Sequence, residues 1–366
     1  MITTAPKMMR LQRTIIAGKR AYHDLVTLPG SKPIVSSGPP GYSAVSGHRV
    51  TVFGCTGFLG RYLVSKLGKM GTQVIVPFRD EDEARLFKPM GDLGQIVRMQ
   101  GWDMRDDQTI AECLRHSDTV YNLVGRDYET KNYDFRAANA LGSERIAKIA
   151  AECGVSQFIQ VSHLNASKTS PSKFYQAKAE GEELVKAVFP SATIVRPGPM
   201  FGYEDKFLTN MAVWPIWWKL NHGQTTTRPV HVMDVAQGLA NLMTNPQFSK
   251  TLTLPGPSTL TYEYLLELVS SVTLQPASRA PVVPKGVATV LAKIGQNVWW
   301  PSLSPDEVTR RYIDDADIPG DWDAVCVQPS EIETHAITYL RRYRSAENYV
   351  RPVVFPPRPA PSLVAE

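Results

Sequence analysis

Three glycines at intervals of three residues, Gly54, Gly57 and Gly60, restrict the possible folds of this chain more than any other feature. They follow the short apolar run 50–53 and precede a helical pattern of apolar residues over 59–70. Such a strand-to-helix turn brings the backbone and the free N–H groups of the helix close to a pyrophosphate. A Cβ at Gly54 or Gly57 would obstruct the turn or that approach. The segment predicts a dinucleotide site, and the alternative is a glycine-rich turn without a ligand.

Further strands and helices alternate along the first 200 residues. The expected strands are 73–78, 96–100, 119–124, 158–161 and 193–195, and the clearest helices between them are 139–153 and 177–188. Alternation of this kind implies a parallel sheet that is covered on both faces. We predict an α/β fold with a Rossmann-type, doubly wound parallel sheet over 49–200.

The alternation weakens after residue 200. Helical patterns are expected at 262–273, 284–296 and 330–344, and Ser330, with Glu333 three residues later, is the expected N-cap of the last one. We predict a smaller C-terminal mixed region over 201–350, interleaved with the Rossmann domain, that docks on other proteins. Trp-rich segments at 214–218 and 299–300 suit a partner or membrane interface about as well as core packing.

The two ends of the chain differ in composition from the rest. Residues 1–22 hold five basic and no acidic residues, which is typical of a mitochondrial targeting segment. The alternative is a basic terminus that has no targeting function. Residues 23–48 form an extended Pro/Gly/Ser-rich leader, and 351–366 form a Pro-rich tail. Without the five N-terminal charges, 35 of the 40 basic residues remain against 35 acidic ones, so we expect no nucleic-acid partner.

Cysteine and histidine usage indicates neither a disulfide framework nor a metal site. The four cysteines lie far apart and form no C-x-x-C pair: Cys55, Cys113, Cys153 and Cys326. His163 and His231 lack the spacing of metal ligands. No stretch of about 20 apolar residues predicts a membrane span.

These segments together resemble the extended or atypical short-chain dehydrogenase/reductase superfamily. The segment 54–60 is similar to the glycine motif of that superfamily, and Asp103 matches the acid that contacts adenine. Residues 122–125 stand where the superfamily has the strand end beside the nicotinamide ribose. Residues 196–199 and 230–236 are similar to two further stretches of its extended branch.

A narrower resemblance rests on 74–79, 91–95, 122–127, 129–132 and 161–166. In combination these segments resemble the nucleotide-binding accessory subunits of mitochondrial respiratory complex I. That resemblance implies a tightly held NADPH and no turnover of its own. It also implies a place on the matrix side, peripheral to the inner membrane, among other complex I subunits near the quinone region.

The end of the second predicted strand bears on the choice of nucleotide. An NAD site usually has an acid there that binds the adenosine ribose, but here Arg79 precedes Asp80. Arg79 can pair with a 2′-phosphate, so we favour NADP(H), and Asp80 keeps NAD(H) as the less favoured alternative. The predicted cofactor-binding residues are Gly54, Thr56, Gly57, Phe58, Leu59, Gly60, Arg79, Asp103, Leu123, Val124, Gly125, Ser162, Lys178 and Pro197.

The catalytic pair of this superfamily is incomplete. A working reductase needs a Tyr four residues before a Lys, which lowers the pKa of the phenol. Lys178 is the matching Lys, but Phe174 stands four residues before it and Tyr175 three before it. Either Tyr175 substitutes through a local shift of the helix, or the site is inactive. We favour the inactive site and predict no catalytic residue, since Ser162 alone cannot replace a phenol.

Three functions follow from these observations. The first is a non-catalytic NADPH-binding subunit needed for the assembly or stability of complex I. The second is a stand-alone NADPH-dependent reductase or sugar-nucleotide epimerase. The third, an NADP-sensing regulator, would require bound nucleotide to exchange. Phe174 favours the first.

Overall fold

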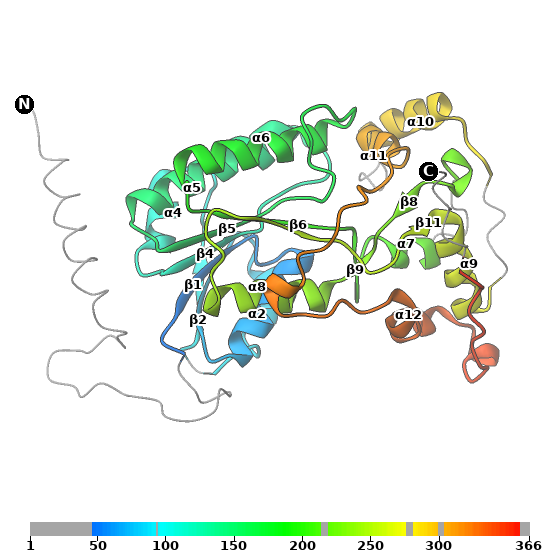
Figure 1. Ribbon diagram of the computed structural model, residues 1–366, viewed down its shortest axis with the longest axis horizontal. Coiled ribbons are helices and arrows are strands. Elements are labelled where there is room, and N and C mark those ends of the chain that lie inside the picture. Colours follow the sequence, from blue (N-terminus) through cyan, green and yellow to red (C-terminus); the bar gives the residue numbers. More distant parts are fainter. Residues whose placement is uncertain (1–45, 93, 214–218, 276–280, 299–303, 359–366) are drawn as a thin grey trace, which may run out of the picture.

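The computed structural model describes residues 46–92, 94–213, 219–275, 281–298 and 304–358 (Figure 1). The predicted targeting segment 1–22 lies outside these residues, as do nearly all of the leader, the Trp-rich segments and the last eight residues of the tail.

A seven-stranded parallel sheet forms the centre of the protein, with the strand order β10-β6-β5-β4-β1-β2-β3. Its strands are β1 (Arg49–Phe53), β2 (Gln73–Phe78), β3 (Ile96–Gln100), β4 (Thr119–Asn122), β5 (Gln157–Val161), β6 (Thr193–Pro197) and β10 (Thr251–Leu254). The predicted doubly wound sheet is confirmed, and β10 adds a strand that the sequence pattern did not reveal. The winding reverses between β1 and β4, and folds of this kind bind ligands at that point, in the crevice outside the carboxyl ends of the strands.

Helices cover both faces of the sheet (Figure 1). On one face lie α4 (Asp107–Leu114), α5 (Gly142–Glu152) and α6 (Lys173–Val188), and on the other lie α2 (Phe58–Lys69) and α8 (Val232–Thr244). The short α3 (Glu81–Ala84) follows β2. Since α8 and β10 come after residue 200, the sheet and its helices include residues well beyond the alternating part of the sequence.

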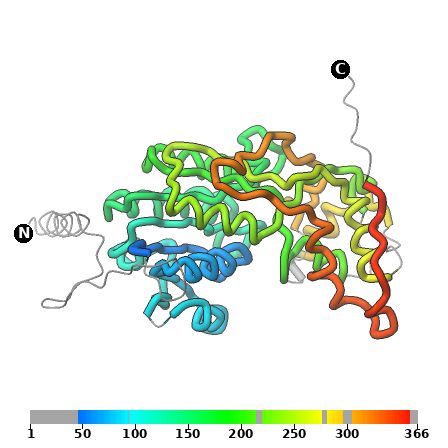
Figure 2. The backbone as a smooth tube through the Cα atoms, turned by 60° about the horizontal axis from the view of Figure 1, so that its bottom comes forward, coloured from blue at the N-terminus to red at the C-terminus, as the bar shows by residue number. Residues whose placement is uncertain are grey.

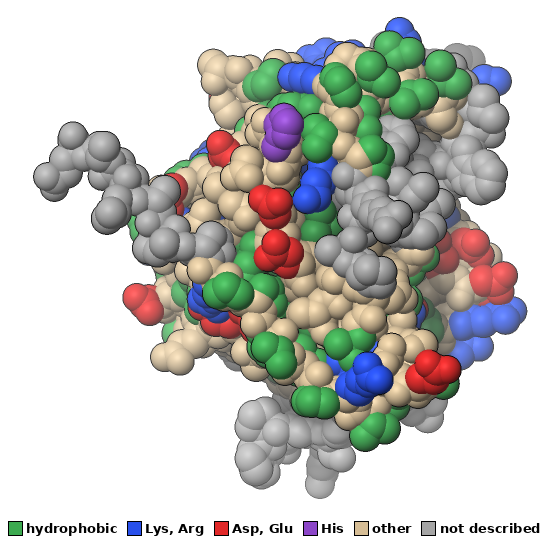
Figure 3. All heavy atoms as spheres, turned by 90° about the vertical axis from the view of Figure 1, so that its right-hand side faces the viewer, with side chains coloured by type: hydrophobic (Ala, Val, Ile, Leu, Met, Phe, Trp, Pro, Cys, Tyr) green, Lys and Arg blue, Asp and Glu red, His purple; other side chains and the backbone are tan. Residues whose placement is uncertain are grey.

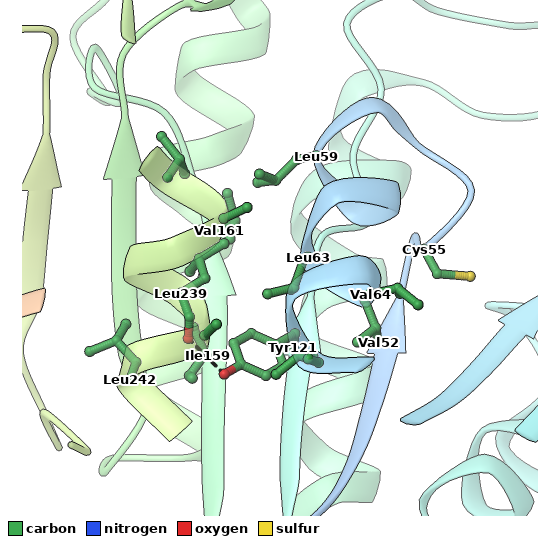
Figure 4. Packing of buried hydrophobic residues seen from close by; sticks show 14 of the residues in the cluster. Val52, Cys55, Leu59, Leu63, Val64, Tyr121, Ile159, Val161, Leu239 and Leu242 are labelled. Carbon is green, nitrogen blue, oxygen red and sulfur yellow. Dashed lines mark hydrogen bonds between the residues drawn. The ribbon is translucent and has the colours of Figure 1, made fainter. Parts of the chain in front are cut away.

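The core between the sheet and the pair α2 and α8 is apolar and closely packed (Figure 4). Leu63 of α2 and Leu239 of α8 are fully buried above Tyr121 of β4. The Tyr121 hydroxyl donates a hydrogen bond to the Leu239 carbonyl oxygen at 2.7 Å, which satisfies a buried polar group. Each fully buried leucine of this kind contributes about 1.5–3 kcal/mol.

Most of the C-terminal region gathers at one end of the sheet, while the orange part of the tube runs back along the sheet layer (Figure 2), where Trp322 and Val325 join the core on α8. Its strand pairs are β7 (Met200–Phe201) with β9 (Val230–His231) and β8 (Thr226–Thr227) with β11 (Leu260–Thr261). Its helices are α7 (Leu208–Val213), α9 (Tyr262–Thr273), α10 (Lys285–Val298), α11 (Pro305–Arg310) and α12 (Ile332–Leu340). A second apolar cluster joins α7, α9 and α12.

The predicted start of the last helix is wrong. The N-cap of α12 is Glu331, whose side chain makes no capping hydrogen bond, and the helix ends at Leu340. The Ser330 N–H instead donates to the Asp234 carboxylate of α8 at 2.7 Å. Ser330 therefore makes a tertiary hydrogen bond to α8 and does not cap α12.

Candidate dinucleotide site

Gly54, Thr56 and Gly57 lie in the β1–α2 turn, and Phe58, Leu59 and Gly60 begin α2. The other predicted cofactor residues except Lys178 lie at or just beyond the carboxyl ends of parallel strands, and so at one edge of the sheet. Gly54 and Arg79 directly follow β1 and β2, and Asp103 lies three residues after β3. Leu123, Val124 and Gly125 follow β4, Ser162 follows β5, and Pro197 ends β6. With about 4.8 Å between neighbouring strands, β2 and β6 lie about 19 Å apart. The edge is thus long enough for an extended ligand, with its two ends at different strands.

Gly54 makes the turn between β1 and α2 possible. Its φ is +78°, a conformation that side chains other than glycine rarely adopt. A Cβ built there would lie 2.9 Å from the Leu123 carbonyl carbon, so Gly54 also permits the β4 strand end to approach. A Cβ on Gly60 would lie 2.5 Å from the carbonyl oxygens of Gly54 and Cys55, and this glycine lets α2 pack tightly on the turn.

The N-terminus of α2 has free donors. Gly57 is its N-cap and provides no side-chain acceptor, and its first turn contains no acid. By contrast, the N-terminal amides of α6 and α9 are bonded to Ser172 and Thr261. The amides of α2 therefore point to the crevice between β1 and β4 as donors for an anion.

The two charged residues after β2 have different surroundings. Asp80 is the N-cap of α3, and its carboxylate accepts the Asp82 N–H at 3.0 Å. Arg79, like Asp80, is exposed. After β3, Asp103 accepts the Arg105 N–H at 3.0 Å and the Tyr133 hydroxyl at 3.4 Å. A groove whose lining includes Arg105 and Tyr133 lies next to it.

Lys178 of α6 lies under the loop that follows β4. A Cβ on Gly125 would lie 2.7 Å from the Lys178 Nζ and 3.0 Å from the Asn139 Oδ1, so both side chains approach the backbone of this loop closely. Burial lowers the pKa of Lys178 to about 8, against an opposing effect of Glu182. The buried Ser162 Oγ has no hydrogen-bond partner among the described residues. An unpartnered hydroxyl and a buried ammonium fit the hydroxyl groups of a ribose.

Asn139 is a site residue that the sequence reasoning missed. It lies in a π-helical turn, Ala137–Leu141, directly before α5. Its amide donates to the carbonyl oxygens of Arg126 and Phe135, and its Oδ1 accepts the Arg126 N–H at 3.2 Å. It thereby fixes the loop that carries Gly125. A buried polar residue within an apolar helical stretch was the available signal.

Glu182 and Arg196 form an ion pair between α6, which carries Lys178, and β6. The Arg196 Nε donates to Glu182 Oε1 at 2.8 Å and its Nη2 to Oε2 at 2.6 Å, which is a bidentate pair. Glu182 lies one turn after Lys178 on α6, and Arg196 lies on β6. The pair ties the Lys178 helix to the sheet.

Phe174 and Tyr175 occupy different environments. The Lys178 Nζ lies 5.8 Å from the centroid of the Phe174 ring, one helical turn away. The Tyr175 ring lies 4.8 Å from the ring of His163, and its phenol interacts with the Asn165 side chain. Burial raises the pKa of Tyr175. The side chain that faces Lys178 at this turn is a phenyl ring, which has no proton to exchange.

Residues 50–252 match the model of the NAD dependent epimerase/dehydratase family. The chain is 39% identical to the mitochondrial NADH-ubiquinone oxidoreductase 40 kDa subunit of Neurospora crassa over 337 residues, 91% of this chain and 89% of that protein. It is 40% identical to mitochondrial NADH dehydrogenase [ubiquinone] 1 alpha subcomplex subunit 9 of Rattus norvegicus over 324 residues, 85% of each chain. The chain belongs to this family of complex I subunits.

Solved structures share the fold of this complex I subunit family. A dTDP-glucose 4,6-dehydratase from Streptomyces venezuelae, solved with NAD bound, matches with a TM-score of 0.63 at 18% identity, over 83% of this chain and 99% of that one. The resemblance predicted from the sequence segments is therefore confirmed, and so is the Rossmann-type fold.

Two further properties concern only the part of the chain that the structure describes. No group of three or more His, Cys, Asp or Glu side chains there could hold a metal ion. Among the same residues, no helix combines the length and the apolar character that crossing a bilayer requires.

Proposed function

We propose that the chain is a non-catalytic accessory subunit of mitochondrial respiratory complex I that binds NADPH as a structural ligand. The observation that carries this proposal is the phenyl ring of Phe174 beside Lys178, within an otherwise well-formed cofactor site. In this proposal the subunit lies on the matrix side of the inner membrane, among other complex I subunits near the quinone region. Its role is to support the assembly and stability of the matrix arm.

The residues at the sheet edge can be assigned to the parts of NADPH. The α2 amides and the turn around Gly54 would hold the pyrophosphate, Asp103 the adenosine, and Arg79 the 2′-phosphate. Lys178 and Ser162 would bind the nicotinamide ribose, between walls formed by Leu123, Val124 and Gly125 on one side and Pro197 on the other. Bound NADPH supplies a hydride in enzymes, but the ring that lies beside Lys178 one helical turn away is the phenyl ring of Phe174, which cannot donate the matching proton.

The surroundings of Arg79 and Asp80 support NADPH over NADH. Both side chains are exposed, but the Asp80 carboxylate already accepts the Asp82 N–H as the N-cap of α3, and Arg79 directly follows β2. A 2′-phosphate beside Arg79 would form a charge-assisted pair, which is stronger than a neutral hydrogen bond.

A ligand that binds only the folded state stabilises it by mass action. At a nucleotide concentration 100 times the dissociation constant, this effect is about 2.7 kcal/mol. The proposed site involves the ends of six strands, so bound NADPH would stabilise the sheet layer as a whole.

The exposed face of α10 supports a peripheral contact with the inner membrane. Apolar side chains follow the helical spacing along this face and are 44–58% exposed: Val287, Val290, Leu291 and Ile294. The opposite face packs through Ala288 and Ala292. Figure 3 shows hydrophobic side chains gathered on the upper part of the molecule, where α10 lies. The helix contains lysines but no acid, as expected for contact with an anionic bilayer surface.

The proposal can be tested on solubilised mitochondria by native gel electrophoresis. We expect the chain in the band of complex I, and we expect that band to release NADPH, detected by its fluorescence. The purified chain should oxidise no more than one equivalent of NADPH with a panel of carbonyl substrates. Migration as a small free protein, or sustained turnover, would favour the alternative of a stand-alone NADPH-dependent short-chain reductase or epimerase that uses Tyr175.

A further inference from the structure

The segment 304–316, which contains α11, lies against the N-terminus of α6. Asp306 accepts two hydrogen bonds there, from the Ser172 Oγ and from the Lys173 N–H, both at 2.8 Å. A carboxylate at a helix N-terminus is favourable because it meets free amides and the positive end of the helix dipole. The start of α11 is thus fixed to the helix that carries Phe174 and Lys178.

Arg310, at the other end of α11, covers the Phe174 ring. Its Cζ lies 4.8 Å from the ring centroid, and its Nη2 donates to the Asp127 carbonyl oxygen at 2.9 Å. Its Nε lies 3.4 Å from the Asp306 carboxylate. The Arg310 side chain is only 15% exposed and Phe174 only 7%. Arg310 therefore bridges the loop after β4 and the first turn of α6.

Hydrogen bonds also fix the residues that follow α11. Asp315 accepts a hydrogen bond from the Asn165 Nδ2 at 2.7 Å, and the Ala316 N–H donates to the Asn165 Oδ1 at 2.9 Å. Asn165 belongs to the loop after β5 and interacts with Tyr175. Ile313 packs on the cluster that contains Phe174 and Tyr175. Segment 304–316 is thus bound to both loops that border the nicotinamide end.

A hydride acceptor in this fold would have to reach the nicotinamide between these two loops, on the side of residue 174. That volume holds the Arg310 guanidinium, a planar group that stacks well on an aromatic ring. We propose that residues 304–316 form a built-in plug in which Arg310 takes the place of a substrate on Phe174. The plug is a property of the protein itself, and only its shielding of bound NADPH rests on the proposed function.

Thiol labelling of a Phe174→Cys variant tests the plug in the nucleotide-free, full-length chain. The thiol introduced at position 174 and the exposed native Cys326 are labelled with a maleimide, and the rate at each is followed by mass spectrometry of the two peptides. With Arg310 present, the introduced thiol should react at least about tenfold more slowly than Cys326, because labelling requires local opening. Equal rates at the two thiols would overturn the proposal.

Release of the plug should expose the introduced thiol. Arg310→Ala in the Phe174→Cys background should raise the labelling rate at position 174 about tenfold, because it removes hydrogen bonds of a charged group. Thr309→Ala, on the same helix, should leave the rate unchanged, since the Thr309 hydroxyl donates to the Pro305 carbonyl oxygen within α11. If Arg310→Ala does not fold, Asp306→Asn replaces it and should also accelerate labelling. No acceleration in the folded variant would overturn the plug.

A second measurement concerns the bound nucleotide. In the NADPH-loaded native chain, oxidation by phenazine methosulfate should be slower than for free NADPH, and Arg310→Ala should restore the faster rate. Failure of the chain to retain NADPH would overturn the proposed function. It would leave the labelling result, and with it the plug, to be judged separately.

Discussion

The two ends of the candidate site, one proposed to bind the phosphates and the other the nicotinamide, are built in different ways. The phosphate-binding end consists of one continuous segment, in which Gly54, Gly57 and the first amides of α2 follow each other directly. The nicotinamide end consists of side chains from distant parts of the chain, among them Asn139, Lys178 and Arg310. Backbone geometry at the first end can bind any dinucleotide. Side-chain identity at the second end decides what a bound nucleotide can do, and there the chain has a phenyl ring and an arginine.

The largest expected effect is at the phosphate-binding end. Gly54→Ala should lower the free energy of unfolding by about 3 kcal/mol or more, since its Cβ meets backbone atoms and φ is left-handed. Gly94→Ala is the matched control, because Gly94 has a φ of +81° but open space around it, and should cost about 1 kcal/mol. Chemical denaturation measures both. Equal losses would mean that close approach of β4 does not constrain Gly54.

Arg79→Ala tests the adenosine side of the same end. Loss of a charged pair with the 2′-phosphate should weaken NADPH binding by about 1.5–3 kcal/mol, roughly tenfold to a hundredfold, and leave NADH binding unchanged. Arg85→Ala, at an exposed arginine on the next helical turn, is the control. Isothermal titration of both nucleotides provides the measurement. Undiminished NADPH binding in Arg79→Ala would contradict the assigned preference.

The nicotinamide end should respond to pH through Lys178. Burial lowers its pKa from 10.5 to about 8, so between these values the unfolded chain binds more protons than the folded one. Stability from this group therefore rises as pH increases from 8 to 10, by about 1–2 kcal/mol in the nucleotide-free chain. Lys178→Met should remove that part of the pH dependence. Denaturation curves at both pH values for the two proteins measure the difference, and parallel profiles would show that folding does not lower the pKa of Lys178.

The smallest effect on the site is expected from α10, which is remote from the phosphate-binding end. Ile294→Glu should change the free energy of unfolding by no more than about 0.5 kcal/mol and leave nucleotide binding intact. It should reduce binding to vesicles rich in anionic lipid about tenfold, because an exposed apolar anchor is lost. Phe248→Glu, also an exposed apolar position, is the control for added charge. Vesicle co-sedimentation that is equal for both variants would argue against α10 as the membrane contact.

Much of the fold and part of the site could be predicted from local patterns. The six strands from β1 to β6, the glycine turn and the place of Phe174 before Lys178 depend on neighbouring residues, and their periodicity is visible in the chain. The seventh strand, β10, was missed because its run of four residues carries no such signal. The start of α12 was misplaced because Asp234, nearly 100 positions earlier, binds Ser330.

By itself, then, the amino-acid sequence determined the parallel sheet, the glycine turn between β1 and α2, and the absence of a hydroxyl at position 174. Only the tertiary structure decided that Asn139 supports the Gly125 loop, that Tyr175 turns toward His163 and Asn165, and that Arg310 lies on Phe174. The physical reason is the separation in sequence between the residues that make contact. Turns and periodic elements arise from residues a few positions apart, whereas these contacts join side chains that meet only when separate layers of the protein have packed together.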